Sequence, residues 1–71
     1  MADSIIIKQE VNGIRISTVN LKNDDIFSFE TACFFGTKML MNEGFQCQYT
    51  TVADAIRGHQ KMVERVLKLT A

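Results

Sequence analysis

The sequence predicts an α+β fold in which an antiparallel sheet of about four strands, a β-hairpin and two further strands, packs against one C-terminal helix. β-Branched residues flank an Asn-Gly pair near the N-terminus, two later segments alternate apolar and polar residues, and the C-terminal segment repeats apolar residues at helical spacing. With 71 residues we expect one domain, residues 1–71. A chain this short buries only about 60% of the surface that its unfolded form exposes, which leaves little room for a large catalytic cleft.

The first segment, SIIIKQEVNGIRISTVNL, is predicted to form a β-hairpin. Asn12-Gly13 favours a type I′ turn, which needs positive φ at both central positions and places Val11 opposite Ile14. The inner face of this hairpin is then expected to carry Ile5, Ile7, Val11, Ile14 and Ile16, and the outer face Lys8, Glu10, Arg15 and Ser17. The alternation changes phase after Thr18, so we expect a bulge or a strand end there.

Two later segments are predicted to be strands. IFSFETACFF alternates along residues 26–35, with Phe27, Phe29, Thr31, Cys33 and Phe35 on one face. A helix over residues 28–42 is the alternative, but the density of Phe, Thr and Cys and the glycine at position 36 favour a strand. FQCQYT is the fourth strand, with Phe45, Cys47 and Tyr49 inward. Loops are expected at residues 22–25 and 36–44.

The C-terminal segment is predicted to be a helix that begins near Val52 and ends at about Leu69. Its apolar stripe consists of Val52, Ile56, Val63, Val66 and Leu67, flanked by Ala55 and Met62. Thr51 and Asp54 resemble a capping box, and the aspartate is favourable at the positive end of the helix dipole.

Gly58 and His59 are the unusual residues of this helix. The helical wheel places His59 in the centre of the apolar stripe, where we expect a buried neutral imidazole hydrogen-bonded to a backbone carbonyl or to a hydroxyl such as that of Tyr49. Glycine costs about 1 kcal/mol relative to alanine inside a helix, so Gly58 needs a local cause. We expect the close approach of another backbone, the alternative being a flat spot where a partner docks.

The two cysteines are expected to face inward as free thiols. If Phe35 paired with Phe45, Cys33 and Cys47 would lie opposite each other and a disulfide would be conceivable, but a reducing cytosol favours free thiols. A cysteine nucleophile with His59 as its base is the one arrangement that resembles an active site, and it lacks an oxyanion donor. A zinc site would need three or four ligands at suitable spacing. We therefore expect no catalytic residue, no metal, no cofactor and no enzyme.

Composition and charge restrict the partners. Eight basic and eight acidic side chains cancel, so no net charge attracts the chain to nucleic acid or to an anionic membrane. No apolar run approaches the length of a membrane span, and the N-terminus lacks the features of a secretory signal, so we expect a cytoplasmic protein. Two surfaces could bind a partner: the basic helix residues Arg57, Lys61 and Arg65, and the apolar group Phe34, Met39, Leu40 and Met41.

Two motifs carry a resemblance to known proteins. The chain has E-T-x-x-F at Glu30, Thr31 and Phe34, and later Y-x-T-x-x-[ED]-A-x-x-G-H-x-x-M-V at Tyr49, Thr51, Asp54, Ala55, Gly58, His59, Met62 and Val63. Over residues 29–63 it resembles a group of small phage-encoded and prophage-encoded proteins of uncharacterised function. Ala32-Cys33 departs from the larger apolar pair that is usual there, and the hairpin lies outside the resemblance. The resemblance implies a strand, strand, helix core from a mobile genetic element and no particular activity.

The resemblance to phage-encoded proteins favours a small accessory protein of the host cytoplasm. We expect it to act as a non-catalytic binding module that attaches to a host or phage protein, such as a component of a defence system or a nuclease, and alters its activity. One alternative is a homo-oligomeric structural or assembly protein that hides Phe34 and the loop from Met39 to Met41 in a self-interface. The other is a weak nucleic-acid binder that uses the C-terminal helix, which lacks the aromatic residues that would stack on bases.

Overall fold

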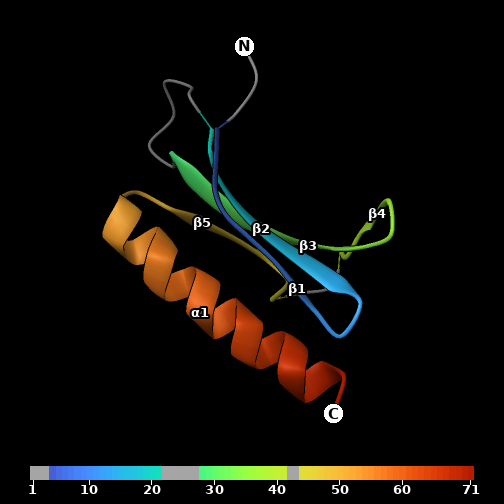
Figure 1. Ribbon diagram of the computed structural model, residues 1–71. Helices are drawn as coiled ribbons and strands as arrows, with labels where there is room; N and C mark the ends of the chain where they lie inside the picture. The colour runs from blue at the N-terminus through green and yellow to red at the C-terminus, as the bar shows by residue number, and fades with distance from the viewer. Residues whose placement is uncertain (1–3, 22–27, 42–43) are drawn as a thin grey trace.

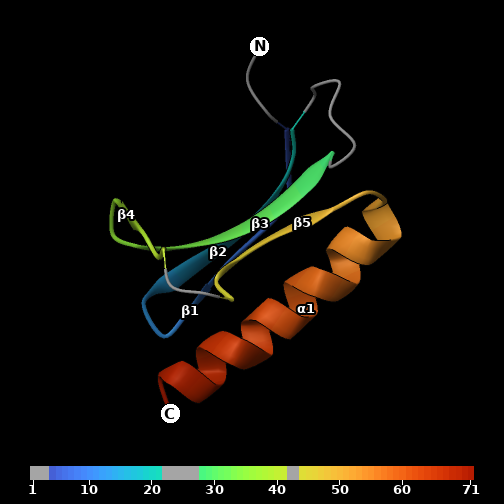
Figure 2. The same ribbon diagram turned by 180° about the vertical axis from the view of Figure 1, so that it is seen from behind.

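In the computed structural model, which describes residues 4–21, 28–41 and 44–71, an antiparallel sheet lies over a single long helix (Figures 1 and 2). The elements are β1 Ser4–Val11, β2 Ile14–Asn20, β3 Phe29–Phe35, β4 Lys38–Met39, β5 Gln46–Tyr49 and α1 Val52–Leu69. This arrangement confirms the predicted α+β fold, including the bounds of the helix. The loop expected at residues 22–25 lies outside the described residues.

Strands β1 and β2 form the predicted hairpin. Asn12 and Gly13 have φ values of 51° and 86°, as a type I′ turn requires, and Val11 pairs with Ile14. The side chain of Asn12 also donates a hydrogen bond of 2.9 Å to the Thr70 hydroxyl, so the turn contacts the C-terminal end of α1.

The predicted irregularity lies in β1, between Ile5 and Ile7, opposite Thr18 and Val19 of β2. Because the extra residue reverses the alternation, Ile5 pairs with Val19 and is 59% exposed. The prediction that Ile5 faces the core is therefore wrong. Thr18 occupies the inner face instead and is fully buried.

Strand β3 confirms the predicted third strand, and the helical alternative over residues 28–42 is wrong. β2 pairs with one edge of β3, while β4 and β5 share the other edge. The segment 36–44, expected to be a loop, thus contains the short strand β4. Met39 of β4 pairs with Phe34 of β3. Phe35, expected in the core, is 63% exposed because β3 ends there, beside the hairpin turn.

The pairing of β5 corrects the expected position of the cysteines. Because β4 occupies the edge beside Phe34 and Phe35, β5 pairs further along β3, with Thr31 opposite Cys47. Cys33 therefore does not face Cys47 in the register, and both thiols are free, as expected. The alternation of β5 is as predicted, with Gln46 and Gln48 outward.

Helix α1 is rotated relative to the predicted stripe. Its buried residues are Ala55, Gly58, His59, Met62 and Val66. Val52, Ile56 and Leu67, expected to face the sheet, are 48%, 45% and 46% exposed. The small Ala55 and Gly58 let the helix approach the sheet on one side, which turns the larger apolar residues away from it. The core itself comprises Ile14, Ile16, Cys33, Phe45, Met62 and Val66.

Candidate functional site

A groove of about 410 Å³ lies between strand β5 and helix α1. Both elements lie side by side in Figures 1 and 2. The strand wall consists of Cys47, Gln48, Tyr49 and the following Thr50. The helix wall consists of Asp54, Arg57, Gly58, Lys61, Met62 and Arg65. The structure therefore brings the three basic residues singled out from the sequence into one groove.

The basic wall follows from helical spacing. Arg57, Lys61 and Arg65 are four residues apart, so they form one row along α1. Arg57 makes an ion pair with Asp54, and Arg65 donates a hydrogen bond to the carbonyl oxygen of Gly44. Among the described residues Lys61 has no ion pair. Three cations and one carboxylate thus line the groove, which leaves it positively charged.

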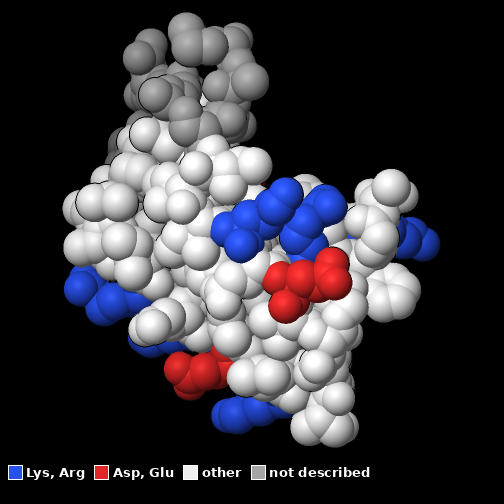
Figure 3. Space-filling view, in the orientation of Figure 1, with Lys and Arg blue, Asp and Glu red and all other residues white. Residues whose placement is uncertain are grey.

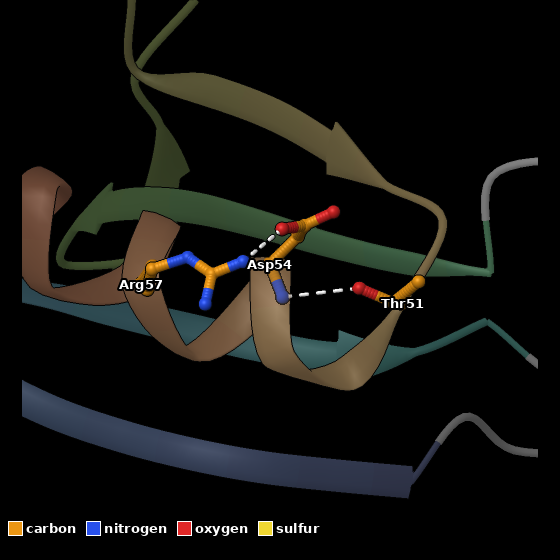
Figure 4. A network of polar contacts seen from close by, with 3 residues as sticks. All are labelled: Thr51, Asp54 and Arg57. Carbon is orange, nitrogen blue, oxygen red and sulfur yellow. Dashed lines mark hydrogen bonds and ion pairs between the residues drawn. The ribbon is translucent and has the colours of Figure 1, made fainter.

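The first turn of α1 fixes one end of the groove. The Thr51 hydroxyl accepts a hydrogen bond of 3.1 Å from the backbone N–H of Asp54, which confirms the Thr51 half of the predicted capping box. The Asp54 carboxylate points along the helix toward Arg57 (Figure 4). This carboxylate is also favourable at the positive end of the helix dipole, and both members of the ion pair line the groove.

The ring of Tyr49 lies so close to Gly58 that a side chain at position 58 would collide with it. A Cβ at position 58 would lie 2.1 Å from the Tyr49 hydroxyl oxygen and 2.2 Å from the ring carbon that carries it. The expected close approach is therefore present, but the neighbour is a side chain of β5 and not a backbone. Burial raises the pKa of the Tyr49 hydroxyl, so it is neutral at physiological pH. This contact sets the spacing between the two walls of the groove.

His59 lies on the other side of α1 and is 2% exposed. Its Nε2 is 2.6 Å from Gln9 Oε1, which can only accept, so Nε2 carries the proton and donates. Burial lowers the pKa of the imidazole, so Nδ1 of the neutral ring accepts a hydrogen bond of 2.7 Å from the Thr18 hydroxyl. The expected buried and hydrogen-bonded histidine is confirmed, with Thr18 in the place proposed for Tyr49.

The same network contains Thr31, whose hydroxyl lies 2.6 Å from that of Thr18. Since the Thr18 proton is given to His59, Thr31 donates to Thr18. Every buried side-chain N and O atom of the described residues has a partner. These contacts connect α1 to β1, β2 and β3. One signal in the sequence could have indicated this network, because the alternation of the hairpin places the polar residues Gln9 and Thr18 on its inner face.

The cysteines do not form a reactive pair with His59. Burial, and then the neighbouring Cys47, raises the pKa of the Cys33 thiol to about 11, so it is protonated at neutral pH and a poor nucleophile. His59 already uses both ring nitrogens in hydrogen bonds to Gln9 and Thr18. Within the described ranges, no three His, Cys, Asp or Glu side chains are grouped to hold a metal ion.

The second predicted surface lies on the opposite side of the sheet from the helix. Phe34 pairs with Met39, and its ring lies 4.8 Å below the Arg15 guanidinium. Gln46 donates hydrogen bonds to the sulfur atoms of Met39 and Met41, at 2.7 and 3.3 Å. Leu40 packs against the core instead. The candidate partner residues therefore fall into two separate surfaces, and the helical one lines a groove.

No protein-family model matches this chain, no curated protein is significantly similar to it, and no solved structure matches its fold. None of the helices described is long and apolar enough to cross a membrane.

Proposed function

We propose that this protein is a non-catalytic binding module of phage type, and that the groove between β5 and α1 binds an extended acidic segment of a host or phage protein. The observation that carries the proposal is the meeting of a basic helix row with the free edge of a sheet in one groove. The strand edge would bind the backbone of such a ligand, and the basic row would bind its acidic side chains.

The free edge of β5 offers backbone hydrogen bonds. β5 pairs with β3 on one side, and no described strand pairs with it on the other. An extended peptide can add a strand to such an edge, with the main chain giving affinity and alternate side chains giving specificity. We therefore expect the ligand to run along Gln46–Tyr49, with every second side chain directed toward α1.

The basic row selects the charge of those side chains. Arginine holds a carboxylate through two parallel N–H groups, and lysine adds a point charge. Arg57 and Arg65 are eight residues apart, which corresponds to about 12 Å along a helix. The four residues of β5 extend for about 14 Å. The two walls thus match in length, and the groove fits an extended segment of about four residues.

Nucleic acid fits the groove less well. Proteins that bind single strands stack successive bases on aromatic side chains. Tyr49 is the aromatic residue that lines the groove, and its hydroxyl end lies against Gly58, where a base cannot enter. The net charge of the chain is also zero.

The test uses fluorescence anisotropy with labelled peptides of alternating sequence, one of repeated Thr-Glu and one of repeated Thr-Gln, and a labelled single-stranded DNA. We expect the Thr-Glu peptide to bind, the Thr-Gln peptide to bind at least about tenfold more weakly, and salt to weaken the binding. Lys61→Glu should abolish binding, whereas Lys68→Glu, the same change on the same helix but outside the groove, should not.

Three results would contradict the proposal: equal binding of the two peptides, binding that survives Lys61→Glu, or tighter binding of the DNA than of the acidic peptide. The last result would favour the nucleic-acid alternative. Circular dichroism of each variant establishes that the fold is intact.

A further inference from the structure

Strand β1 forms the other free edge of the sheet. It pairs with β2 alone, and none of the described strands lies on its second side. β1 is the strand nearest the viewer in Figure 1, and it is eight residues long. An open edge of this length can pair with another chain unless charges, bulges or covering segments prevent it.

An exposed apolar stripe of α1 lies on the same side of the molecule. It consists of Val52, Ile56, Val63 and Leu67, of which three are 45–48% exposed and Val63 is half-buried. Val63 lines a shallow hollow together with Gln9 of β1, Gln60 and Glu64, which places this member of the stripe on the β1 side of the helix. In Figure 3 an uncharged band separates the charged groups over the sheet from those along the helix.

We propose that a second copy of this chain binds at the β1 edge, with the two β1 strands antiparallel about a twofold axis at Gln9. In this register Lys8 of each copy lies opposite Glu10 of the other, and Ile7 lies opposite Val11. A twofold interface must be self-complementary, and this register satisfies that condition on both faces of the joined sheet. The two pairs of opposite charges lie on its outer face, and the apolar pairs lie on its inner face.

The backbone of β1 permits this register. Val11 and Ile14 flank a two-residue turn and exchange hydrogen bonds, so the backbone groups of Lys8 and Glu10 point to the free edge. Pairing centred on Lys8 or on Glu10 would set like charges directly opposite, which is destabilising. Pairing centred on Ile7 would run into the bulge of β1. The register centred on Gln9 therefore combines available hydrogen bonds with opposite charges.

The helix stripe extends the same interface. The stripe runs from Val52 to Leu67, about 22 Å along the helix. Joining the β1 edges places the two stripes on the same face of one continuous sheet, facing each other across the twofold axis. Ile7 and Val11 of both copies lie between them. The dimer thereby removes apolar side chains of both layers from water, which a strand edge alone would not do.

Charge reversal tests the register. Analytical ultracentrifugation over a concentration series would be run on the wild type, Lys8→Glu, Glu10→Lys and an equimolar mixture of the two variants. We expect a wild-type dimer, a dissociation constant raised at least about tenfold in each variant alone, and recovery in the mixture, where glutamates face lysines. Lys68→Glu is the matched control for the charge change and should leave the dimer unaffected.

A second pair of variants tests the helix stripe without touching the hairpin. Ile56→Lys should weaken the dimer by at least about tenfold, whereas Leu69→Lys, at a more exposed apolar position of the same helix outside the stripe, should not. A wild type that stays monomeric at millimolar concentration would overturn the proposal. Reversed charges that leave the dimer unchanged, or a mixture that does not recover it, would refute this register. The proposal does not depend on the peptide groove.

Discussion

The two free edges of the sheet offer different surfaces to a partner, although one helix lies beside both. At β5 the helix presents Arg57, Lys61 and Arg65, and the space between helix and strand is open. At β1 the helix presents the apolar residues Val52, Ile56 and Leu67, and the strand carries Lys8 and Glu10 on one face. The comparison shows how a rotation of the helix decides which of its faces meets each edge.

The rotation has an identifiable physical cause on each side. On the β5 side the absence of a side chain at Gly58 makes room for the Tyr49 ring. On the β1 side His59 reaches both Gln9 and Thr18. These contacts fix the helix so that Ala55, Met62 and Val66 enter the core. Substitutions and a change of pH can disturb these contacts, and their effects are expected to decrease in the order given below.

Gly58→Ala should destabilise the fold by about 3 kcal/mol, because the new methyl group must displace the Tyr49 ring, and this overpacking outweighs the gain in helix propensity. Urea denaturation measures the change. The control is the same substitution in a Tyr49→Leu background, where the hydroxyl end of the ring is absent and the cost should largely disappear. A Gly58→Ala variant that unfolds at higher urea than the wild type would show that Tyr49 does not fix the helix.

Thr18→Val should destabilise the fold by about 2 kcal/mol, because it leaves Nδ1 of His59 without a donor and the Thr31 hydroxyl without its acceptor. Thr18→Ser, which keeps the hydroxyl, should cost less. The free energy of unfolding from urea titration distinguishes the two. Equal values for valine and serine would mean that the hydrogen bonds of this network contribute little.

Stability should fall on acidification below the ordinary pKa of histidine, about 6.5. Burial lowers the pKa of His59 in the folded protein, so between 6.5 and that lower value the unfolded state binds a proton that the folded state does not. Above pH 6.5 this contribution is constant. The urea midpoint measured across this range in the wild type and in His59→Gln isolates the effect. A wild-type slope that persists unchanged in the variant would contradict it.

Lys61→Glu should change the free energy of unfolding by less than about 0.5 kcal/mol, since the side chain is exposed. Its effect should be confined to binding in the groove. A large loss of stability would show that Lys61 supports the fold and would remove it as a test of binding.

Local patterns predicted most of the elements. Asn12-Gly13, the alternation of β3 and β5, and the cap at Thr51 are properties of short segments, and each was confirmed. Such features depend on backbone sterics and on neighbours in sequence, which a single sequence displays. The bulge was also signalled, although its extra residue lies in β1.

The position of β5 and the rotation of α1 depend on long-range packing, which sequence patterns do not show. The position of β5 follows from β4, a two-residue strand too short to leave a pattern. The rotation of α1 follows from contacts of Gly58 with Tyr49 and of His59 with Thr18, between residues far apart in the chain. For the same reason the basic residues were predicted as one helix face, while the strand wall of their groove was missed.

We propose that the two edges bind two different partners independently. The most direct test measures dimerisation by sedimentation and Thr-Glu peptide binding by anisotropy on the same samples of wild type, Lys8→Glu and Lys61→Glu. We predict that Lys8→Glu weakens the dimer and leaves the peptide affinity within about twofold of wild type, and that Lys61→Glu does the reverse. Loss of both activities in either variant would contradict the account, because the two edges would then form one surface.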